Sequence, residues 1–331
     1  MKNLITRRAV ISALAALPLV CGSVSQGFAA DKIKIRMSTS GSETAQRGIA
    51  LVKKFGPGVA SFAEFEPHWN STLFRQGTEL EAIARGNLEM SITSAQELAE
   101  FFPEFSIFTA GYVHRDAAHQ VAVFNDPLMK PFKEKVEDEL GIKLLTVMYL
   151  GRRQVNLSTE GKVMTPADLK GVTLRMPGTE SWQFLGKALG ASPTPMAFSE
   201  VYTALQTGAI DGQDNPLPTV VDKKFYEVTK QIILTSHLVD LNYIAISKEL
   251  WDDLTPGQQK QMQKAADDAA EFGRTNQLKL ESELVSFLQE QGLKVYEPDQ
   301  KAFRERVQGM YLESDYAKNW PKGLLDKINA L

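Results

Sequence analysis

The sequence predicts an α/β fold built from two domains, and three observations lead to this prediction. Residues 33–92 alternate between short strand patterns and helix patterns, an order typical of a parallel sheet with right-handed crossovers. Residues 258–291 contain no proline and a single glycine, Gly273, which predicts a helix of roughly 51 Å, longer than one small domain. Once an N-terminal segment is set aside, about 300 residues remain, which fits two hydrophobic cores.

The N-terminal segment, residues 1–29, has the pattern of a signal peptide. A basic start precedes the apolar run 9–20, and the small-residue site 27–29 follows it. The apolar run is too short to span a membrane, so we expect an exported protein without a membrane anchor. Whether export follows the general or the twin-arginine route stays open. The only cysteine, Cys21, lies in this segment, so we expect neither a disulfide nor a thiol nucleophile in the mature protein.

In the first half of the chain, alternation of apolar and polar residues marks short strands, and apolar spacing of three to four marks helices. A helix pattern around 79–85 ends at Gly86, as helices commonly do. The patterns predict strands at 33–37, 62–66, 88–92 and 142–157, and helices at 45–54 and 79–85.

In the second half, capping residues mark where the helices begin. Thr165 and Thr255 each precede a proline and stand three residues before Asp168 and Gln258, which is the capping-box pattern. Between 165 and 255 the patterns predict strands at 172–176, 231–234 and 241–246, and helices around 182–189 and 199–207. A short strand at 293–296 precedes mostly helical residues 304–331.

The charge balance limits the class of partner. Lys and Arg number 37 and Asp and Glu 40, which gives a net charge of −3. Removal of residues 1–29 takes away three positive charges, so the mature net charge becomes (37 − 3) − 40 = −6. An acidic surface of mixed charge argues against nucleic acid or an anionic membrane as partner. Any anion-binding site must therefore be a local basic feature.

The motifs of several enzyme classes are missing from the sequence. It has no Gly-rich phosphate loop, no Gly-x-Ser-x-Gly elbow and no zinc-ligand spacing among its four histidines. We therefore expect no cofactor and no metal. A pair of aspartates, Asp211 and Asp214, could act as acid and base, but their spacing is more typical of a turn.

Residues 165–216 carry the chemistry that points to a ligand. Arg175 stands at the end of the predicted strand 172–176, just before the turn Pro177-Gly178. Ligands of open α/β sheets bind beyond the carboxyl ends of the strands. An arginine there can hold a carboxylate with two parallel hydrogen bonds. An ordinary surface ion pair is the alternative, and the residues alone leave both open.

This stretch contains the blocks Asp168-Leu169-Lys170-Gly171, Leu174-Arg175-Met176-Pro177, Leu189-Gly190-Ala191, Pro195-Met196, residues 200–208 and Asp211-Gly212-Gln213-Asp214-Asn215-Pro216. In the order and spacing of these blocks it resembles the solute-binding proteins of TRAP (tripartite ATP-independent periplasmic) transporters, DctP family. The resemblance implies a periplasmic-binding-protein-like fold, with two α/β domains around a cleft and a long domain-spanning helix. It also implies a periplasmic, non-enzymatic protein that delivers an organic acid to TRAP membrane permease subunits. The oligomeric state stays open, with a monomer as the default expectation.

The resemblance also assigns roles to residues of the second domain. Arg175 would make the bidentate contact with the carboxylate. Arg153, in the element Gly151-Arg152-Arg153-Gln154, would be the second arginine facing it. Asn215 would bind the acid or a neighbouring hydroxyl. Phe198 stands where the family often places a side chain against the ligand, although a core position is equally open.

Residues of the first domain supply further candidates. The loops with Glu43, Arg75 and Ser94 follow the first three predicted strands, so they should gather at one sheet edge. Tyr112 ends an aromatic-rich region, residues 101–112, that could line the cleft or the core. The metal-binding tryptophan-glutamate element of some family members is absent after Asn215.

The chain should cross between the domains several times. We predict one domain at residues 31–152 plus 240–280 and the other at 153–239 plus 281–331, closing about a hinge over the ligand. A sugar acid, an aromatic acid and a dicarboxylate all remain possible as ligands. A periplasmic sensor for a signalling partner, or less favoured a periplasmic enzyme on the same scaffold, are the alternative functions.

Overall fold

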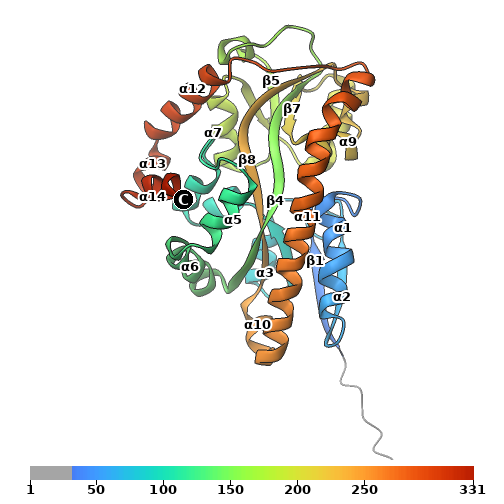
Figure 1. Ribbon diagram of the computed structural model, residues 1–331, viewed down its shortest axis with the longest axis vertical. Helices are drawn as coiled ribbons and strands as arrows, with labels where there is room; N and C mark the ends of the chain where they lie inside the picture. The colour runs from blue at the N-terminus through green and yellow to red at the C-terminus, as the bar shows by residue number, and fades with distance from the viewer. Residues whose placement is uncertain (1–31) are drawn as a thin grey trace, which may run out of the picture. The chain divides into compact units, whose positions relative to one another are not determined.

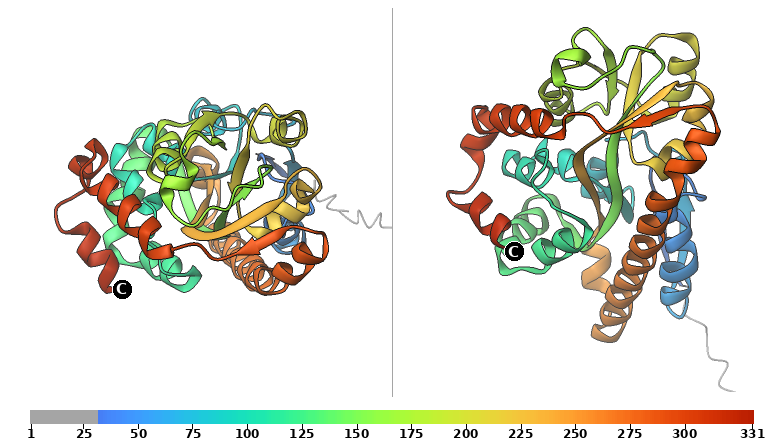
Figure 2. Two further views of the ribbon diagram at one scale, coloured as in Figure 1. Left: turned by 90° about the horizontal axis from the view of Figure 1, so that it is seen from above. Right: turned by 45° about the horizontal axis from the view of Figure 1, so that its top comes forward.

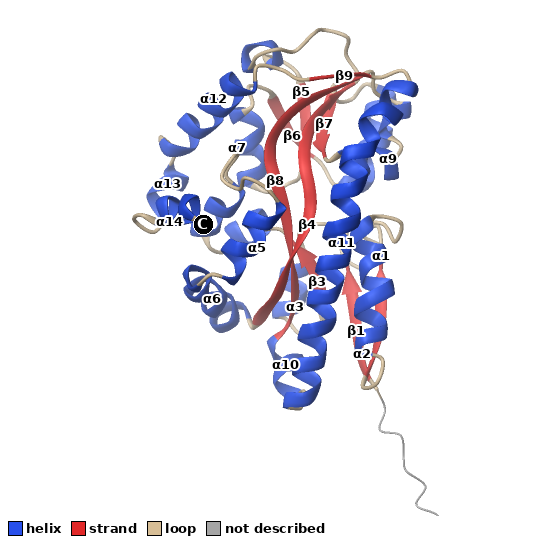
Figure 3. Cartoon of the chain, in the orientation of Figure 1, coloured by secondary structure: helices blue, strands red, loops and turns tan. Residues whose placement is uncertain are grey.

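The computed structural model describes residues 32–331, so the predicted signal peptide lies outside the described residues. In this part of the chain nine strands form one sheet in the order β2-β1-β3-β8-β4-β7-β5-β6, with β9 paired to β8 (Figures 1 and 3). The strands are β1 Ile33–Ser38, β2 Ala63–His68, β3 Met90–Thr93, β4 Ile142–Leu157, β5 Thr173–Met176, β6 Ser192–Pro195, β7 Gly212–Asn215, β8 Gln231–Ser247 and β9 Lys294–Tyr296.

Helices cover both faces of this sheet (Figure 3). The α-helices are α1 Gln46–Ala50, α2 Gly56–Val59, α3 Glu79–Ala84, α4 Ala95–Ala99, α5 Ala117–Asn125, α6 Lys130–Leu140, α7 Glu180–Ala188, α8 Val201–Thr207, α9 Leu217–Asp222, α10 Lys248–Asp253, α11 Pro256–Glu290, α12 Gln300–Leu312, α13 Asp315–Asn319 and α14 Leu324–Ala330. A π-helical turn, Leu51–Phe55, joins α1 to α2, and 3₁₀ helices lie at Pro103–Thr109, Pro127–Met129, Pro166–Leu169, Phe198–Glu200 and Phe225–Glu227. Within residues 32–331 no helix is both long and apolar enough to cross a membrane.

Two parallel groups of strands flank a central antiparallel pair. β1 pairs in parallel with β2 and β3, and β5 pairs in parallel with β6 and β7. Between the groups, β4 and β8 run antiparallel to each other, and their outer neighbours β7 and β3 are antiparallel to them. Each parallel group with its helices forms one lobe, which confirms the predicted two-domain α/β fold. We call the lobe with β1, β2 and β3 the first lobe and that with β5, β6 and β7 the second.

The strands β4 and β8 extend through both lobes (Figure 1). They remain paired from Ile142 opposite Ser247 to Leu157 opposite Gln231, with three irregularities in register. The prediction of two separate strands at 231–234 and 241–246 is therefore wrong. The polar residues between them break the apolar pattern, yet they are buried and hydrogen-bonded. These polar side chains fit in the buried strand because hydrogen-bond partners inside the protein, rather than apolar contacts, surround them.

Helix α11 connects the two lobes along one face of the sheet. It has 35 residues and begins with a capping box between Thr255 and Gln258, so its length is about 52 Å and the predicted long helix is confirmed. It packs against α1 and α2 at one end and against α9 at the other (Figures 1 and 2). Gly273 is buried on it, and a Cβ there would lie 3.4 Å from the Cβ of Ala50.

The cores differ on the two faces of the sheet. On the α11 face each lobe has its own core, one around Ile35, Leu51 and Ala266 and another around Leu205 and Leu288. A third, larger core includes residues of both lobes, among them Leu98, Phe105, Leu174, Leu185 and Val307.

The predicted domain crossings lie at one level of the molecule. Arg152 pairs with Val239 in the sheet, so the crossings at 152/153 and 239/240 are neighbours. Glu281 on α11 accepts hydrogen bonds from the Arg152 backbone N–H and the Tyr149 hydroxyl, both at 2.6 Å. The third crossing, at 280/281, is therefore adjacent too. The domain limits themselves stay a prediction.

Candidate ligand-binding site

A cavity lies where the ends of several strands from both lobes meet. The parallel strands β1, β3 and β5 end at this cavity with their carboxyl ends. This is the position at which α/β sheets bind ligands. The long strands β4 and β8 pass beside it. Its walls are formed by Thr39, Ser40, Arg47, Gln76, Ile92, Ser94, Glu97, Leu150, Arg153, Arg175, Pro177, Trp182, Phe198, Asn215, Thr219, Asp240 and Asn242.

Arg175 is a buried cation without a carboxylate partner. Its side chain is 1% exposed. The Nε and Nη2 atoms donate to the Met196 carbonyl at 2.9 and 2.7 Å, and Nη2 also donates to Gln76 Oε1 at 3.3 Å. Among the described residues, none accepts a hydrogen bond from Nη1. Burial, followed by the nearby charge of Arg153, lowers the pKa of Arg175 to about 9.

An unpaired buried charge is costly unless a partner is supplied. A carboxylate of a ligand would provide that partner, with Nη1 free to donate to it. Pro177 ends β5 directly after Met176, which leaves the Arg175 fork at the strand end that opens into the cavity. The local sequence and the burial therefore agree on an anion anchor.

Arg153 also lines the cavity, but carboxylates already hold it. Its Nε donates to Asp214 Oδ2 at 2.6 Å, Nη2 donates to Asp214 Oδ1 at 3.1 Å, and Nη1 donates to Asp240 Oδ2 at 2.8 Å. Its guanidinium lies 4.5 Å from the ring centre of Trp182. Burial alone would lower the pKa of Arg153, but the two aspartates raise it above its usual range. The two arginines named from the sequence therefore differ, since only Arg175 is unpaired.

The network behind Arg153 continues into the sheet. His237 Nε2 lies 3.0 Å from Asp214 Oδ2, and His237 Nδ1 lies 2.7 Å from Thr235 Oγ1. Burial would raise the pKa of Asp214, but Arg153 and His237 outweigh it and hold that pKa below its usual range. The Thr-His-Asp order resembles a hydrolase triad. Thr235 and His237 are each 0% exposed and do not line the cavity, so the threonine is not placed to attack a bound substrate.

Asn215, Ser94 and Phe198 line the same cavity. Asn215 Nδ2 donates to Gln213 Oε1 at 2.5 Å, which leaves its own Oδ1 available. Ser94 caps α4, because its Oγ accepts from the Glu97 N–H at 3.2 Å. Phe198 is half-buried and packs edge-on to Phe225 with ring centres 6.0 Å apart. It therefore serves the core and lines the cavity.

The other three sequence candidates lie elsewhere. Tyr112 packs in the core, with its hydroxyl on the Thr235 carbonyl at 2.9 Å and its ring under the Arg304 guanidinium. Arg75 is exposed and lines a neighbouring cavity. Glu43 is exposed on its loop. The loops of Arg75 and Glu43 do lie near the site, since Gln76 and Ser40 of the same loops line the cavity. Successive side chains of a loop point in different directions, and sequence alone does not say which side chain enters the cavity.

Sequence reasoning missed Arg47, at the start of α1. Its guanidinium donates to Asn242 Oδ1 and forms no ion pair within the described part of the chain. Burial lowers the pKa of Arg47 to about 10, against the opposing charge of Asp240. The only sequence signal was its position just after the polar loop 38–44, which follows the first strand.

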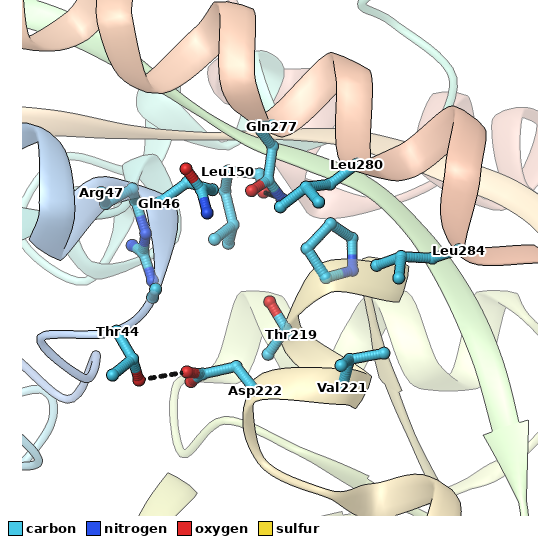
Figure 4. Close-up of a pocket in the computed structure, with 12 residues that line it drawn as sticks. Thr44, Gln46, Arg47, Leu150, Thr219, Val221, Asp222, Gln277, Leu280 and Leu284 are labelled. Atoms are coloured by element: carbon cyan, nitrogen blue, oxygen red, sulfur yellow. Dashed lines mark hydrogen bonds between the residues drawn. The ribbon is translucent and has the colours of Figure 1, made fainter. Parts of the chain in front are cut away.

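A second cavity lies on the other side of Arg47, between α1, α9 and α11 (Figure 4). It shares Arg47, Leu150 and Thr219 with the first cavity. At its edge Asp222 on α9 accepts hydrogen bonds from Ser42 Oγ at 2.7 Å and Thr44 Oγ1 at 2.6 Å. These bonds join the first-lobe loop to the second lobe, and no local sequence pattern predicts them.

Metal binding has no support in the described residues. No group of three or more histidine, cysteine, aspartate or glutamate side chains in residues 32–331 could hold a metal ion. The polar atoms that face the cavity are instead suited to an anion with hydroxyl groups, which needs both donors and acceptors.

Two α/β lobes around a polar cavity with an unpaired buried arginine define a solute-binding protein. The chain belongs to the bacterial extracellular solute-binding protein family 7 (DctP), whose sequence profile matches residues 59–318. The predicted family is thereby confirmed, and as a member of it the chain is a transport protein rather than an enzyme.

Similar proteins bind acidic sugars. The sialic acid-binding periplasmic protein SiaP of Vibrio cholerae is 32% identical over 252 residues, 76% of this chain and 77% of its own. The 2,3-diketo-L-gulonate-binding periplasmic protein YiaO of Escherichia coli is 29% identical over 255 residues, 77% of each chain.

Two solved structures share the fold throughout. A TRAP periplasmic solute-binding protein of Roseobacter denitrificans, with bound 3-deoxy-D-manno-oct-2-ulosonic acid (KDO), is 68% identical with a TM-score of 0.90, covering 91% of this chain and 99% of that one. A protein of the same kind from Haemophilus influenzae, with bound L-gulonate, is 28% identical with a TM-score of 0.82, covering 90% and 99%.

Proposed function

We propose that the protein is the periplasmic solute-binding component of a TRAP transporter and that its solute is a sugar acid of the KDO type. The observation that carries the proposal is the unpaired, buried guanidinium of Arg175 at the cavity wall. The neighbour that is 68% identical over 91% of this chain holds KDO, and identity at that level favours a ligand of the same class.

The lining of the cavity favours a sugar acid over the other two acid classes. Arg175 and Arg47 offer free donors, and Asn215 Oδ1 and Glu97 Oε1 accept no hydrogen bond from the described residues. A ligand rich in hydroxyl groups can satisfy both kinds of group. An aromatic acid would leave the acceptors unsatisfied, and each buried polar group without a partner costs about 1–3 kcal/mol. A dicarboxylate would satisfy donors but not acceptors.

Binding would proceed by closure of the two domains over the acid. Residues of both lobes line the cavity, so a ligand that contacts both stabilises the closed form by its differential affinity for that form. The adjacent crossings at 152/153, 239/240 and 280/281 would form the hinge. The closed protein would then deliver the acid to the membrane permease subunits of the transporter.

Isothermal titration calorimetry of the refolded mature chain tests the solute, because refolding removes any ligand carried through purification. The panel contains KDO, L-gulonate, succinate and benzoate. We expect KDO to bind most tightly and Arg175→Ala to abolish its binding. Equal affinity for succinate or benzoate would contradict the sugar-acid proposal. Unchanged KDO binding by Arg175→Ala would show that Arg175 is not the anchor.

Delivery to a permease needs a separate experiment. Uptake of labelled KDO into proteoliposomes that contain the TRAP permease subunits should require the wild-type binding protein. Tight binding without any stimulation of uptake would favour a sensor for a signalling partner. Chemical change of KDO during incubation with the protein alone would favour an enzyme.

A further inference from the structure

We infer that Glu97 determines the specificity of the cavity by accepting hydroxyl groups of the bound acid and by excluding a second carboxylate. The inference rests on the proposed function and names a determinant for the end of the ligand that lies away from its own carboxylate. Glu97 was not among the candidates from the sequence, and it lies in α4, directly after β3.

The Glu97 carboxylate is held firmly by only one of its two oxygens. Its Oε2 accepts from Thr93 Oγ1 at 2.9 Å and from the Ser94 N–H at 2.8 Å. Ser94 completes a capping box by accepting from the Glu97 N–H. Within residues 32–331 no donor reaches Oε1. One oxygen is therefore fixed by the helix cap, and the other is left for a ligand.

Glu97 lines the cavity from the first lobe, whereas Arg175 lines it from the second. Gln76 of the first lobe also lines the cavity, and its Oε1 accepts hydrogen bonds from two donors of the second lobe. An acid that places its carboxylate on Arg175 must therefore extend toward the first lobe to fill the space. Hydroxyl groups on that part of the acid can donate to Glu97 Oε1, because this carboxyl oxygen can accept and no donor of the described residues reaches it.

The same carboxylate disfavours a second negative charge. Burial raises the pKa of Glu97, and burial followed by the charge of Glu97 raises the pKa of neighbouring Glu79 to about 8. Burial therefore disfavours negative charge in this region, and a ligand carboxylate placed beside these two groups would be disfavoured for the same reason.

Arg47 does not remove that penalty. It could in principle hold a second carboxylate, since it forms no ion pair in the described chain. The opposing charges that act on it come from Asp240, Asp222 and Glu97. A carboxylate placed on Arg47 would meet those negative charges as well, whereas a hydroxyl group would not.

The substitution Glu97→Gln separates the role in specificity from a role in folding. Glutamine is a normal capping-box residue, so its amide oxygen can still accept from Thr93 and Ser94. Its amide nitrogen would face the cavity where Oε1 does now, which replaces an acceptor by a donor at the same size. Glu100→Gln is the matched control, because Glu100 is exposed and does not line this cavity.

The probes are three eight-carbon acids. KDO carries hydroxyl groups, octanoate carries none, and suberate carries a second carboxylate. Calorimetry should show that Glu97→Gln weakens KDO roughly 10- to 100-fold, as expected for a hydrogen bond to a charged group. The substitution should weaken the binding of octanoate much less, and it should raise the affinity for suberate relative to that for KDO. Glu100→Gln should match the wild type.

Each result decides the inference separately from the proposed function. If Arg175→Ala abolishes KDO binding while Glu97→Gln leaves the ratio of KDO to suberate unchanged, Arg175 remains the anchor and the role of Glu97 is disproved. If the wild type binds suberate as tightly as KDO, both proposals fail. If Glu97→Gln does not fold, Glu97→Asp, which keeps the charge on a shorter chain, must show the same loss of KDO binding or the inference fails.

Discussion

Gln76 and Arg175 meet across the cavity, and one oxygen atom joins the two lobes there. Gln76 Oε1 accepts from Arg175 Nη2 at 3.3 Å and from the Phe198 N–H at 3.0 Å. Gln76 belongs to the loop after β2, whereas both donors belong to the second lobe. The unpaired Arg175 is thus oriented by neutral acceptors, the Gln76 amide and the Met196 carbonyl, which leaves its charge for a ligand.

Gln76→Glu should convert this contact into a competitor for the ligand. A carboxylate beside Arg175 would supply the missing negative charge, so the melting temperature without ligand should rise and KDO binding should be lost. Differential scanning calorimetry with and without KDO measures both. Gln76→Leu, which removes the acceptor without adding charge, should lower the melting temperature. Tight KDO binding by Gln76→Glu would show that Arg175 does not need the ligand's charge.

Asp222→Asn should weaken binding without any contact to the ligand. Asp222 lines only the second cavity and holds Ser42 and Thr44 of the opposite lobe. Loss of the charge weakens two hydrogen bonds that join the lobes in the structure, so we expect roughly 10-fold faster KDO release, since such bonds contribute about 1.5–3 kcal/mol. Stopped-flow fluorescence measures release. Asp138→Asn, on the exposed surface of α6, should leave it unchanged.

Glu79 should make stability depend on pH. Its folded pKa of about 8 exceeds the unfolded value near 4.3, so between these values the folded state binds more protons. The free energy of unfolding should therefore fall as pH rises from about 5 to about 8, by at most about 1.4 kcal/mol per pH unit. Urea unfolding of Glu79→Gln should lack this slope, whereas exposed Glu81→Gln should keep it.

Asp214→Asn should destabilise the protein strongly at neutral pH. It removes a carboxylate from a buried pair with Arg153, and breaking such a pair costs about 3–5 kcal/mol. Because the folded pKa of Asp214 lies below its unfolded value, its contribution is present above about pH 4 and is lost on further acidification. The variant should thus lose less stability than the wild type between pH 5 and 3 in urea titrations. An equal loss would mean that Asp214 is not the charged partner.

Gly151→Ala should destabilise the region where the chain crosses between the lobes. Gly151 has a φ of +133°, and a Cβ there would lie 2.5 Å from Glu281 Oε1 and 2.6 Å from the Pro216 Cβ. The added methyl group must displace α11 or α9, so we expect a loss of more than about 2 kcal/mol in chemical unfolding. Gly257→Ala, where a Cβ would meet nothing within 4 Å, is the control.

Periodicity and capping predicted most of the fold. The parallel order of β1, β2 and β3 follows from alternation, and the limits of α11 follow from its capping box and its lack of proline. The continuity of β8 could not be predicted, because Thr235, His237 and Asp240 have polar side chains in a buried strand. Their partners, Asp214 and Arg153, are distant in the sequence.

The same limit applies to the site. Arg175 could be named because a strand, a turn and an arginine follow one another within a few residues. Gln76, Arg47 and Asp222 act through contacts between lobes, and no local pattern marks such contacts. Arg153 shows a related limit, since its position was predictable but its two aspartate partners were not.

The shared strands β4 and β8 also have a consequence for how the chain folds. Each lobe contains part of both strands, and they pair residues as far apart in sequence as Ile142 and Ser247. Such non-local pairing requires closure of long loops before it gains free energy, which slows folding. Neither lobe can complete its sheet from a contiguous fragment of the chain. The two lobes should therefore unfold in a single cooperative transition, even though the proposed hinge closure has them rotate against each other in the folded state.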